Sequence, residues 1–277
     1  MMNLPDKLTA MAVERQGLVA RVTLLGPGIG NAMGPDFFRE LPLVFRALEA
    51  EPDVGAIVLA GSGGHFSYGL DVYGMRDVLA PFFGDDVPAR ARSAFLATVR
   101  ELQASVTAVA ACRTPVIAAI SGWCIGGGVD LASAADVRLA SADAMFSVRE
   151  ARMAIVADLG SLQRLVGIIG DGHLRELALT GRDIGAHRAE RIGLVNDVYP
   201  DSDSLFHAAH ALAEKMARNS LVALRGIKDV LDAERGPRVE AGLRYVAAWN
   251  AAFLPSRDLR EAMTAFAERR SPDFTGE

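Results

Sequence analysis

The sequence has little cysteine, no strong excess of either charge and no long hydrophobic run. Two cysteines, Cys112 and Cys124, among 277 residues predict neither a disulfide framework nor a cysteine-based metal site. The formal net charge is −5, and no basic stripe alternates with aromatic residues, which argues against nucleic acid as a partner. No apolar run approaches the ~20 residues that a membrane-spanning helix needs. With 51% hydrophobic residues, the chain is expected to be globular.

The ends of the chain carry no recognisable address. The first residues, M-M-N-L-P-D-K, lack the hydrophobic core of a secretory signal and the Arg- and Ser-rich composition of a transit peptide. The last residues, F-T-G-E, do not match a peroxisomal address. We therefore expect a cytoplasmic protein of one large domain, or of one domain with an appendage.

The most informative stretch runs from Ser121 to Leu165. The β-branched run V-I-A-A-I at 116–120 precedes it and predicts a buried strand. Three glycines at 126–128 and the segment V-D-L-A-S-A-A then predict a turn that leads into a helix. This order places bare backbone N–H groups at a helix N-terminus, where they can hold negative charge.

Three acids follow these glycines: Asp130, Glu150 and Asp158. An anion site beside several carboxylates suits proton transfer next to a carbonyl group. Each acid also has a structural interpretation. Asp130 could favour the helix dipole, Glu150 could end a strand in solvent, and Asp158 could cap the helix L-G-S-L-Q-R-L.

The segment S-G-W-C-I-G-G-G-V-D-L resembles the signature of the crotonase (enoyl-CoA hydratase/isomerase) superfamily, whose members act on acyl-CoA thioesters. In that family a carboxylate follows the glycines and a second often lies 20 positions later, as Asp130 and Glu150 do here. The segment A-D-L-G-S-L-Q-R-L, with Asp158, resembles the 3,5-2,4-dienoyl-CoA isomerase branch, whereas hydratases have a glycine-rich loop there. The resemblance extends from about Val13 to Phe274.

The resemblance implies an α/β fold: a crotonase-type spiral of repeated ββα units over 1–201, which holds the acyl-CoA site, and an all-helical region over 202–277. That family uses the helical region for assembly, so a homotrimer or a hexamer made of two trimers is expected. Periodicity predicts strands at 11–14, 18–24, 54–60, 137–140 and 145–148, and helices at 34–51, 89–112, 184–192, 205–219, 221–234, 237–254 and 259–270. The ββα alternation recurs about three times.

The resemblance also assigns binding groups. The backbone N–H of Leu70 and that of Gly127 would form an oxyanion hole for the thioester. Phe266 and Arg269 would reach the acyl-CoA, with Arg269 standing where the family has Lys; Arg keeps the positive charge that a phosphate favours. The resemblance implies no metal and no further cofactor, because coenzyme A is part of the substrate.

Other features carry less weight. The loop G-P-G-I-G-N at 26–31 does not match G-x-G-x-x-G, so a dinucleotide site is rejected. His65 is interpreted as structural rather than as a general base, and the pair His207 and His210 as a surface feature. Asp71 is expected to cap a helix, and 75–86 is expected to be irregular.

The predicted activity is the isomerisation of a 3,5-dienoyl-CoA to the 2,4-conjugated isomer. By resemblance, Glu150 removes the proton at C2, Asp158 donates one at C6, and Asp130 lies between them. One alternative is an enoyl-CoA hydratase in which Asp130 and Glu150 hold the attacking water. An alternative of another class is a non-catalytic acyl-CoA-binding scaffold.

Overall fold

The computed structural model describes residue 4 and residues 7–28, 30–82 and 87–277. Within these ranges the main sheet has six strands in the order β1-β2-β3-β4-β6-β9. Only the β1–β2 pair is antiparallel, and the other neighbours are parallel. The bounds are β1 Met11–Gln16, β2 Val19–Leu24, β3 Ala56–Gly61, β4 Val116–Ile120, β6 Val137–Ser141 and β9 Asp197–Tyr199.

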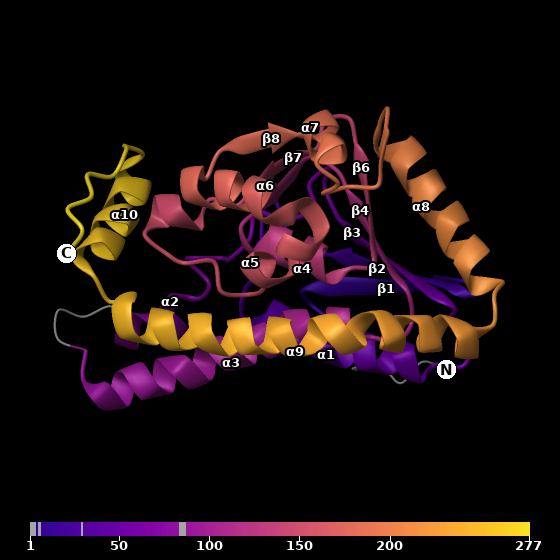
Figure 1. Cartoon of the computed structure of the whole chain (residues 1–277), viewed down its shortest axis with the longest axis horizontal. Coiled ribbons are helices and arrows are strands. Elements are labelled where there is room, and N and C mark those ends of the chain that lie inside the picture. The colour runs from indigo at the N-terminus through magenta and orange to yellow at the C-terminus, as the bar shows by residue number, and fades with distance from the viewer. Residues whose placement is uncertain (1–3, 5–6, 29, 83–86) are drawn as a thin grey trace.

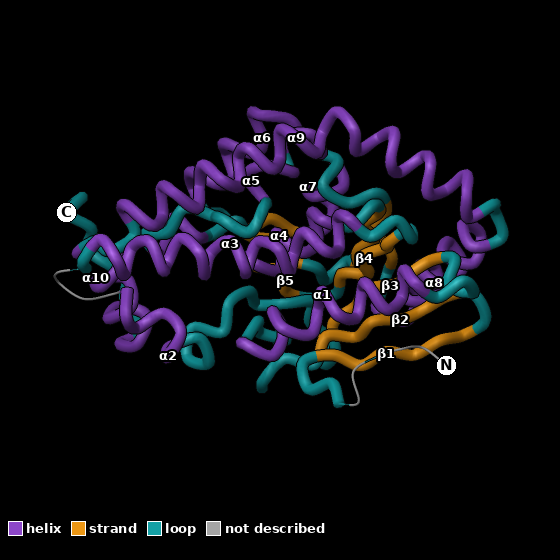
Figure 2. The backbone as a smooth tube through the Cα atoms, turned by 90° about the horizontal axis from the view of Figure 1, so that it is seen from below, coloured by secondary structure: helices purple, strands orange, loops and turns teal. Residues whose placement is uncertain are grey.

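Helices cover both faces of this sheet (Figures 1 and 2). Every residue of β3 and β4 is buried, as expected of parallel strands that are covered on both sides. Alternate side chains of these strands pack on α8 (Ser202–Ala217), and the others join the large core beneath α1 (Pro35–Ala50) and α3 (Ala89–Ala111). The alternation of side chains along a strand therefore divides the interior into two hydrophobic clusters.

A second, three-stranded sheet lies beside the first, in the order β5-β7-β8. Its strands are β5 Trp123–Ile125, β7 Met145–Ser147 and β8 Asp183–Gly185. Sequence reasoning missed β5, which lies between 116–120 and the glycine turn and pairs with β7. Strands that alternate between two sheets give the predicted α/β spiral, which the structure confirms.

The remaining helical elements connect these strands. They are α2 Arg76–Leu79, α4 Gly127–Ala134, α5 Ser161–Arg164, α6 Val166–Thr180 and α7 Ala186–Arg191, with the 3₁₀ turns η1 Ala80–Phe82 and η2 Glu150–Met153. The expectation of an irregular 75–86 was wrong for 76–82, and 83–86 lies outside the described residues. Asp71 caps a turn rather than a helix: its Oδ1 accepts the Gly74 N–H at 2.9 Å, and α2 begins only at Arg76.

The C-terminal region is helical, as predicted, and α9 (Leu221–Phe253) runs along the length of the molecule (Figure 1). The expected break near residue 235 was wrong, since Pro237 lies inside one continuous helix. Pro237 is exposed, so water can hydrate the carbonyl group that loses its helical partner. α10 (Arg257–Glu268) follows. The ammonium group of Lys228, which is buried, contacts Asp136 at 2.6 Å and ties α9 to the sheet.

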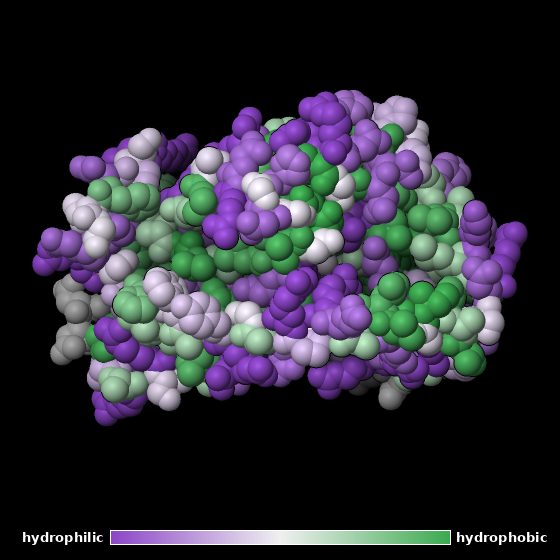
Figure 3. Space-filling model, in the orientation of Figure 1, coloured by the Kyte–Doolittle hydropathy of each residue, from purple (hydrophilic) through white to green (hydrophobic). Residues whose placement is uncertain are grey.

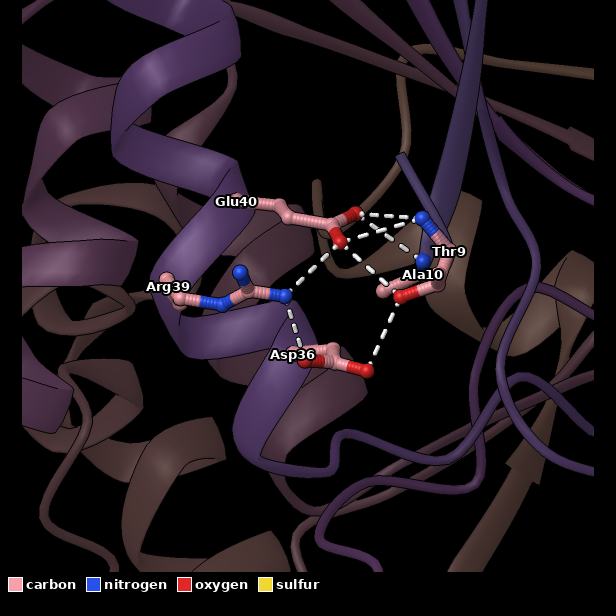
Figure 4. A network of polar contacts seen from close by, with 5 residues as sticks. All are labelled: Thr9, Ala10, Asp36, Arg39 and Glu40. Carbon is pink, nitrogen blue, oxygen red and sulfur yellow. Dashed lines mark hydrogen bonds and ion pairs between the residues drawn. The ribbon is translucent and has the colours of Figure 1, made fainter. Parts of the chain in front are cut away.

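The start of β1 is fastened to α1 by the buried carboxylate of Glu40 (Figure 4). Its oxygens accept the N–H of Thr9 at 3.0 Å and 3.1 Å, the hydroxyl of Thr9 at 2.9 Å and the N–H of Ala10 at 2.9 Å. Arg39 contacts the same carboxylate at 3.3 Å and also pairs with Asp36. Both oxygens of this buried acid are therefore satisfied.

The predicted boundary at residue 201 falls directly before α8, which packs on β2, β3, β4, β6 and β9. The first of the C-terminal helices is thus part of the sheet's covering layer, and α9 and α10 follow it along the outside. In the described part of the chain, no helix is both long enough and apolar enough to cross a membrane.

Candidate active site

Two loops meet at the N-terminus of α4. The N–H groups of Phe66 and Ser67 donate to the carbonyl of Trp123 at 3.1 Å and 3.0 Å, and the Ile125 N–H donates to Ser67 O at 2.9 Å. A Cβ on Gly128 would lie 2.6 Å from that same Ser67 carbonyl oxygen. Glycine is therefore required at 128 for the loops to approach this closely.

This contact places Leu70 beside the first residue of α4. A Cβ on Gly69 would lie 3.0 Å from the Gly127 nitrogen, so the residue before Leu70 touches the backbone of Gly127. The Met33 N–H donates to Gly69 O at 2.8 Å, and the Asp71 N–H donates to Met33 O at 3.1 Å, which holds the chain through Leu70. Among the described residues, neither the Leu70 N–H nor the Gly127 N–H has an acceptor. Two neighbouring N–H groups are thus free to bind an oxygen atom.

Asp130 lies in the first turn of α4 and is 1% exposed. Its Oδ1 accepts the N–H of Ser161, the first residue of α5, at 2.5 Å. The interpretation of Asp158 as the cap of that helix was wrong: Gly160 holds the cap position, and the carboxylate comes from Asp130. Burial raises the pKa of Asp130 to about 6, against the opposing hydrogen bond from Ser161 and the charge of Arg164.

Arg164 is a buried cation, 4% exposed, whose charge lowers the pKa of Asp130. Its guanidinium donates to Leu159 O at 3.0 Å and to the Thr107 hydroxyl at 3.2 Å. A Cβ on Gly160 would lie 1.6 Å from the Arg164 guanidinium, and the φ of Gly160 is +130°. Burial lowers the pKa of Arg164 to about 10, which leaves it charged at neutral pH.

Glu150 begins η2 and faces the glycine turn. A Cβ on Gly126 would lie 3.3 Å from its Oε1. The other oxygen, Oε2, is buried and has no hydrogen-bond partner in the described part of the chain. Burial first, and then the charges of Asp130 and Asp158, raise the pKa of Glu150 to about 8. The structural interpretation of Glu150 as a strand end in solvent was therefore wrong.

Asp158 is half-buried and is held by two side-chain amides. The amide of Asn250 donates to its Oδ2 at 2.7 Å, and the amide of Gln103 donates to its backbone carbonyl at 2.7 Å. Burial raises the pKa of Asp158 to about 7; the bond from Asn250 lowers it, and the charge of Asp130 raises it further. Like Glu150, this carboxyl can change protonation state near neutral pH.

The structure brings the three predicted acids together. The charge of Asp130 raises the pKa of both Glu150 and Asp158, so the carboxyls lie within electrostatic reach of one another. Two of them titrate near neutrality beside a pair of free N–H groups. Groups with pKa values near the operating pH are suited to general acid and base catalysis. The arrangement can therefore remove and return protons beside a bound carbonyl oxygen.

Sequence reasoning missed Arg164, Gln103 and Asn250. Gln103 and Asn250 are 55 and 92 positions from Asp158, so no local pattern connects them with it. The only sequence feature that could have indicated them is their position on the hydrophobic face of a helix. Both are polar residues that share a buried face with hydrophobic neighbours, such as Val99 and Val106 on α3. A buried amide in such a position needs a hydrogen-bond partner.

Phe266 lies on α10, which packs against η2, and Arg269 is the C-cap residue directly after that helix. The Phe266 ring is 6.4 Å from that of Tyr73 and is 51% exposed. Arg269 ends α10 with a φ of +56°. Its guanidinium has no ion pair among the described residues. Neither residue forms a hydrogen bond or ion pair with the three acids.

The histidines occupy the structural positions that were expected. His65 Nδ1 accepts the Trp123 N–H at 3.2 Å, so this ring supports the loop contact. His207 and His210 lie on α8, beside the β1–β2 hairpin and away from α4. Within the described ranges, no group of three or more His, Cys, Asp or Glu side chains is arranged to hold a metal ion.

Comparison with known proteins gives one consistent result. The sequence model of the family "Enoyl-CoA hydratase/isomerase" matches residues 14–277. The chain is 43% identical to the peroxisomal Delta(3,5)-Delta(2,4)-dienoyl-CoA isomerase of Arabidopsis thaliana over 88% of both chains. It is 40% identical to the mitochondrial Delta(3,5)-Delta(2,4)-dienoyl-CoA isomerase of Dictyostelium discoideum, over 92% of this chain and 87% of that one. Among solved structures, an enoyl-CoA hydratase of Mycobacterium avium superposes with a TM-score of 0.81 at 30% identity, over 96% and 99% of the two chains.

Proposed function

Because the chain belongs to the enoyl-CoA hydratase/isomerase family, we propose that it converts a 3,5-dienoyl-CoA to the 2,4-dienoyl-CoA. The observation that carries this proposal is the third carboxyl. Asp158 lies in electrostatic reach of Asp130 and Glu150 and has a pKa of about 7. The identity of 43% and 40% to two dienoyl-CoA isomerases supports the same choice. A hydratase needs acids at one place on the acyl chain, whereas moving two double bonds needs them at two.

The reaction begins with binding of the thioester oxygen by the N–H groups of Leu70 and Gly127. A proton at C2 is weakly acidic, and its removal places negative charge on that oxygen. Two fixed donors stabilise this charge, and the loss of one such donor in other enzymes costs about 3–4 kcal/mol. The position of Gly127 at the start of α4 adds the favourable end of a helix dipole.

Two proton transfers complete the isomerisation. The carboxylate of Glu150 takes the C2 proton, and the electron pair of that C–H bond spreads through the conjugated diene. The carboxyl of Asp158 then gives its proton to C6, where the new C–H bond forms, and is left as a carboxylate. Substrate and product are isomers, so the step needs no oxidant, reductant or added cofactor.

Each turnover leaves Glu150 protonated and Asp158 ionised, and the enzyme must reverse this before it acts again. Burial and the charge of Asp130 raise both pKa values toward neutrality, so a proton can return from one acid to the other at small cost. Asp130 is assigned a tuning role, because its charge raises both pKa values.

Phe266 and Arg269 are proposed to contact the acyl-CoA from α10. Phe266 is exposed beside Tyr73, in the segment that directly follows Leu70. Arg269 presents a guanidinium without an ion pair in the described part of the chain, and such a group suits a phosphate of coenzyme A. The positions of both residues support the proposal that the coenzyme A part of the substrate binds beside α10.

The proposal includes assembly into a homotrimer or a hexamer. Figure 3 shows hydrophobic side chains over the right-hand end of α9, where Val222, Ile227, Val230 and Leu231 are between 55% and 83% exposed. Exposed apolar patches of this kind commonly mark protein–protein contacts. Light scattering coupled to size-exclusion chromatography measures the mass directly, and a monomer would contradict this part of the proposal.

The activity is tested with pure protein and two substrates, a 3,5-dienoyl-CoA and a 2-enoyl-CoA, each followed by absorbance. We expect the first to gain the absorbance of a conjugated 2,4-dienoyl thioester. If only the 2-enoyl-CoA is turned over, the proposed isomerase activity is wrong and the hydratase alternative is supported. Binding of both thioesters without turnover would favour the non-catalytic scaffold.

A further inference from the structure

We propose that Asn250 is a positioning residue that determines which oxygen of Asp158 carries the transferable proton. This inference rests on the proposed function, because it concerns the acid that returns a proton to the acyl chain. Asn250 touches Asp158 rather than the substrate, so its effect acts through that carboxyl.

The amide of Asn250 makes two contacts with one short segment of chain. Its nitrogen donates to the carbonyl of Val156 at 2.9 Å and to Oδ2 of Asp158 at 2.7 Å. A side-chain amide nitrogen carries two hydrogens, so both are used. If the amide were flipped, its oxygen would face the Val156 carbonyl oxygen, and two acceptors would meet. The contact with Val156 therefore fixes the orientation that Asn250 presents to Asp158.

The surroundings leave Asn250 no alternative partner in solvent. It is 1% exposed and lies on the buried face of α9, among Leu243, Val246, Ala247 and Ala251. Unbonded polar groups in such a place are costly, so both bonds are expected to persist. The long helix α9 thus holds the 156–158 segment from outside the active site.

Gln103 also holds residue 158, but it contacts only the backbone, so it can be compared with Asn250. Its amide nitrogen, on α3, donates to the backbone carbonyl of Asp158 at 2.7 Å and to that of Leu243 at 3.0 Å. It is 5% exposed. Gln103 therefore positions the backbone at residue 158 without touching the carboxyl. Gln103 therefore serves as the control for the loss of a buried amide that contacts residue 158 through its backbone only.

The chemistry follows from the direction of the hydrogen bond. An amide N–H can only donate, so Oδ2 of Asp158 must accept, and in the protonated acid the hydrogen is placed on Oδ1. When the O–H bond breaks and the C6–H bond forms, the electron pair of the O–H bond remains on the carboxylate. The contact with Asn250 then becomes a charge-assisted bond, which is stronger. Asn250 therefore orients the acid before transfer and stabilises the anion after it.

The test compares two variants of the full-length protein, Asn250→Leu and Gln103→Leu. Both remove a buried amide that holds the 156–158 segment, and both are expected to lower kcat, since a misplacement near 1 Å can reduce a rate by about 100-fold. KM is expected to change little. Only Asn250→Leu is expected to raise the pKa of Asp158 and so to change the pH profile of kcat, because it removes the bond that lowers this pKa.

Two results would overturn the inference. One is an unchanged kcat and an unchanged pH profile in Asn250→Leu. The other is an equal change of the pH profile in both variants, which would reduce Asn250 to a support of the loop. If Asn250→Leu fails to fold, as judged by circular dichroism, Asn250→Ala takes its place in the same comparison.

A second measurement does not depend on activity. The infrared C=O stretch of a protonated carboxyl is assigned to Asp158 by its loss in Asp158→Asn, and it is then titrated in the wild type and in Asn250→Leu. We expect the band to persist to higher pH in the variant. An unshifted titration would contradict the role of Asn250, whether or not the protein acts on a dienoyl-CoA. If the band shifts as expected but the wild type does not act on a dienoyl-CoA, only the proposed function is refuted.

Discussion

Glu40 and Glu150 are both acids withdrawn from water, yet their surroundings are opposite. The carboxylate of Glu40 accepts two backbone N–H groups and one hydroxyl, and Arg39 contacts it as well (Figure 4). The carboxyl of Glu150 has a buried oxygen without a partner in the described part of the chain, and two further acids lie nearby. The same functional group is thus fully hydrogen-bonded in one place and left without a partner in the other.

The difference separates a structural acid from a reactive one. A buried carboxylate with all its hydrogen bonds made fastens two elements, here β1 and α1, and has no capacity left for a ligand. A buried carboxyl that lacks partners destabilises the fold, and such groups persist where a substrate or a proton is to be exchanged. The comparison predicts that substitutions at the two sites change different measurements.

The largest effect is expected for Glu150→Gln. Without its base, the proposed isomerisation should slow by about 10³-fold, within the range that general base catalysis contributes. The steady-state rate with a 3,5-dienoyl-CoA measures this, and isothermal titration with a saturated acyl-CoA checks that binding is kept. Full activity in Glu150→Gln would remove Glu150 from the mechanism.

Glu40→Ala should act on stability instead. It leaves the buried N–H of Ala10 and the part-buried N–H of Thr9 without their acceptor, and a buried unsatisfied group costs about 1–3 kcal/mol. We expect the free energy of unfolding to fall by about 3 kcal/mol in urea denaturation, while kcat of the folded protein is kept. Glu40→Gln retains one acceptor oxygen and should lose less. A variant with normal stability and no activity would contradict the comparison.

Gly160→Ala should damage the acid cluster through its backbone. A Cβ would overlap the guanidinium of Arg164, and the φ of +130° disfavours any residue but glycine. Such strain costs of the order of 1–3 kcal/mol, read as a lower melting temperature. Gly172→Ala is the matched control, because no atom lies within 4 Å of its Cβ position and it sits inside α6. It should be neutral or slightly stabilising, and equal losses in both would refute the argument.

The smallest effect concerns the pH dependence of stability. The folded protein holds the proton of Glu150 up to a pKa of about 8, whereas the unfolded chain releases it near 4.5. Stability is therefore lost as the pH rises through this window, and the loss is complete above about 8. Glu150→Gln cannot ionise, so its melting temperature should exceed that of the wild type by about 3 °C at pH 8 and by less at pH 5. A larger gain at pH 5 would reverse the sign and contradict the assigned pKa.

Much of this organisation follows from local sequence. The β-branched run at 116–120, the glycines and the acid that follows them predict a strand, a turn into a helix and a carboxylate beside its start, and resemblance gives Glu150 and Asp158 their roles. Local reasoning failed at β5, because three residues are too few to show a strand period. It also failed at Pro237, because the cost of a proline inside a helix depends on whether water can reach the freed carbonyl group.

The supports of the site were harder to predict than its acids. Asn250 and Gln103 reach Asp158 only because α9 and α3 pack side by side, and that packing joins segments far apart in the chain. Arg164 is close to Asp158 in sequence, yet its burial depends on the absence of a side chain at Gly160. Neither the packing of distant segments nor the need for a missing side chain at one position produces a periodic pattern in the sequence.

The most direct measurement of the central claim is the turnover of a 3,5-dienoyl-CoA by Asp158→Asn. The side chain keeps its size but cannot donate the proton to C6. We predict a loss of about 10³-fold in kcat with unchanged affinity for a saturated acyl-CoA. Turnover equal to that of the wild type would contradict the assignment of Asp158 as the acid, and with it the isomerisation that the cluster is proposed to perform.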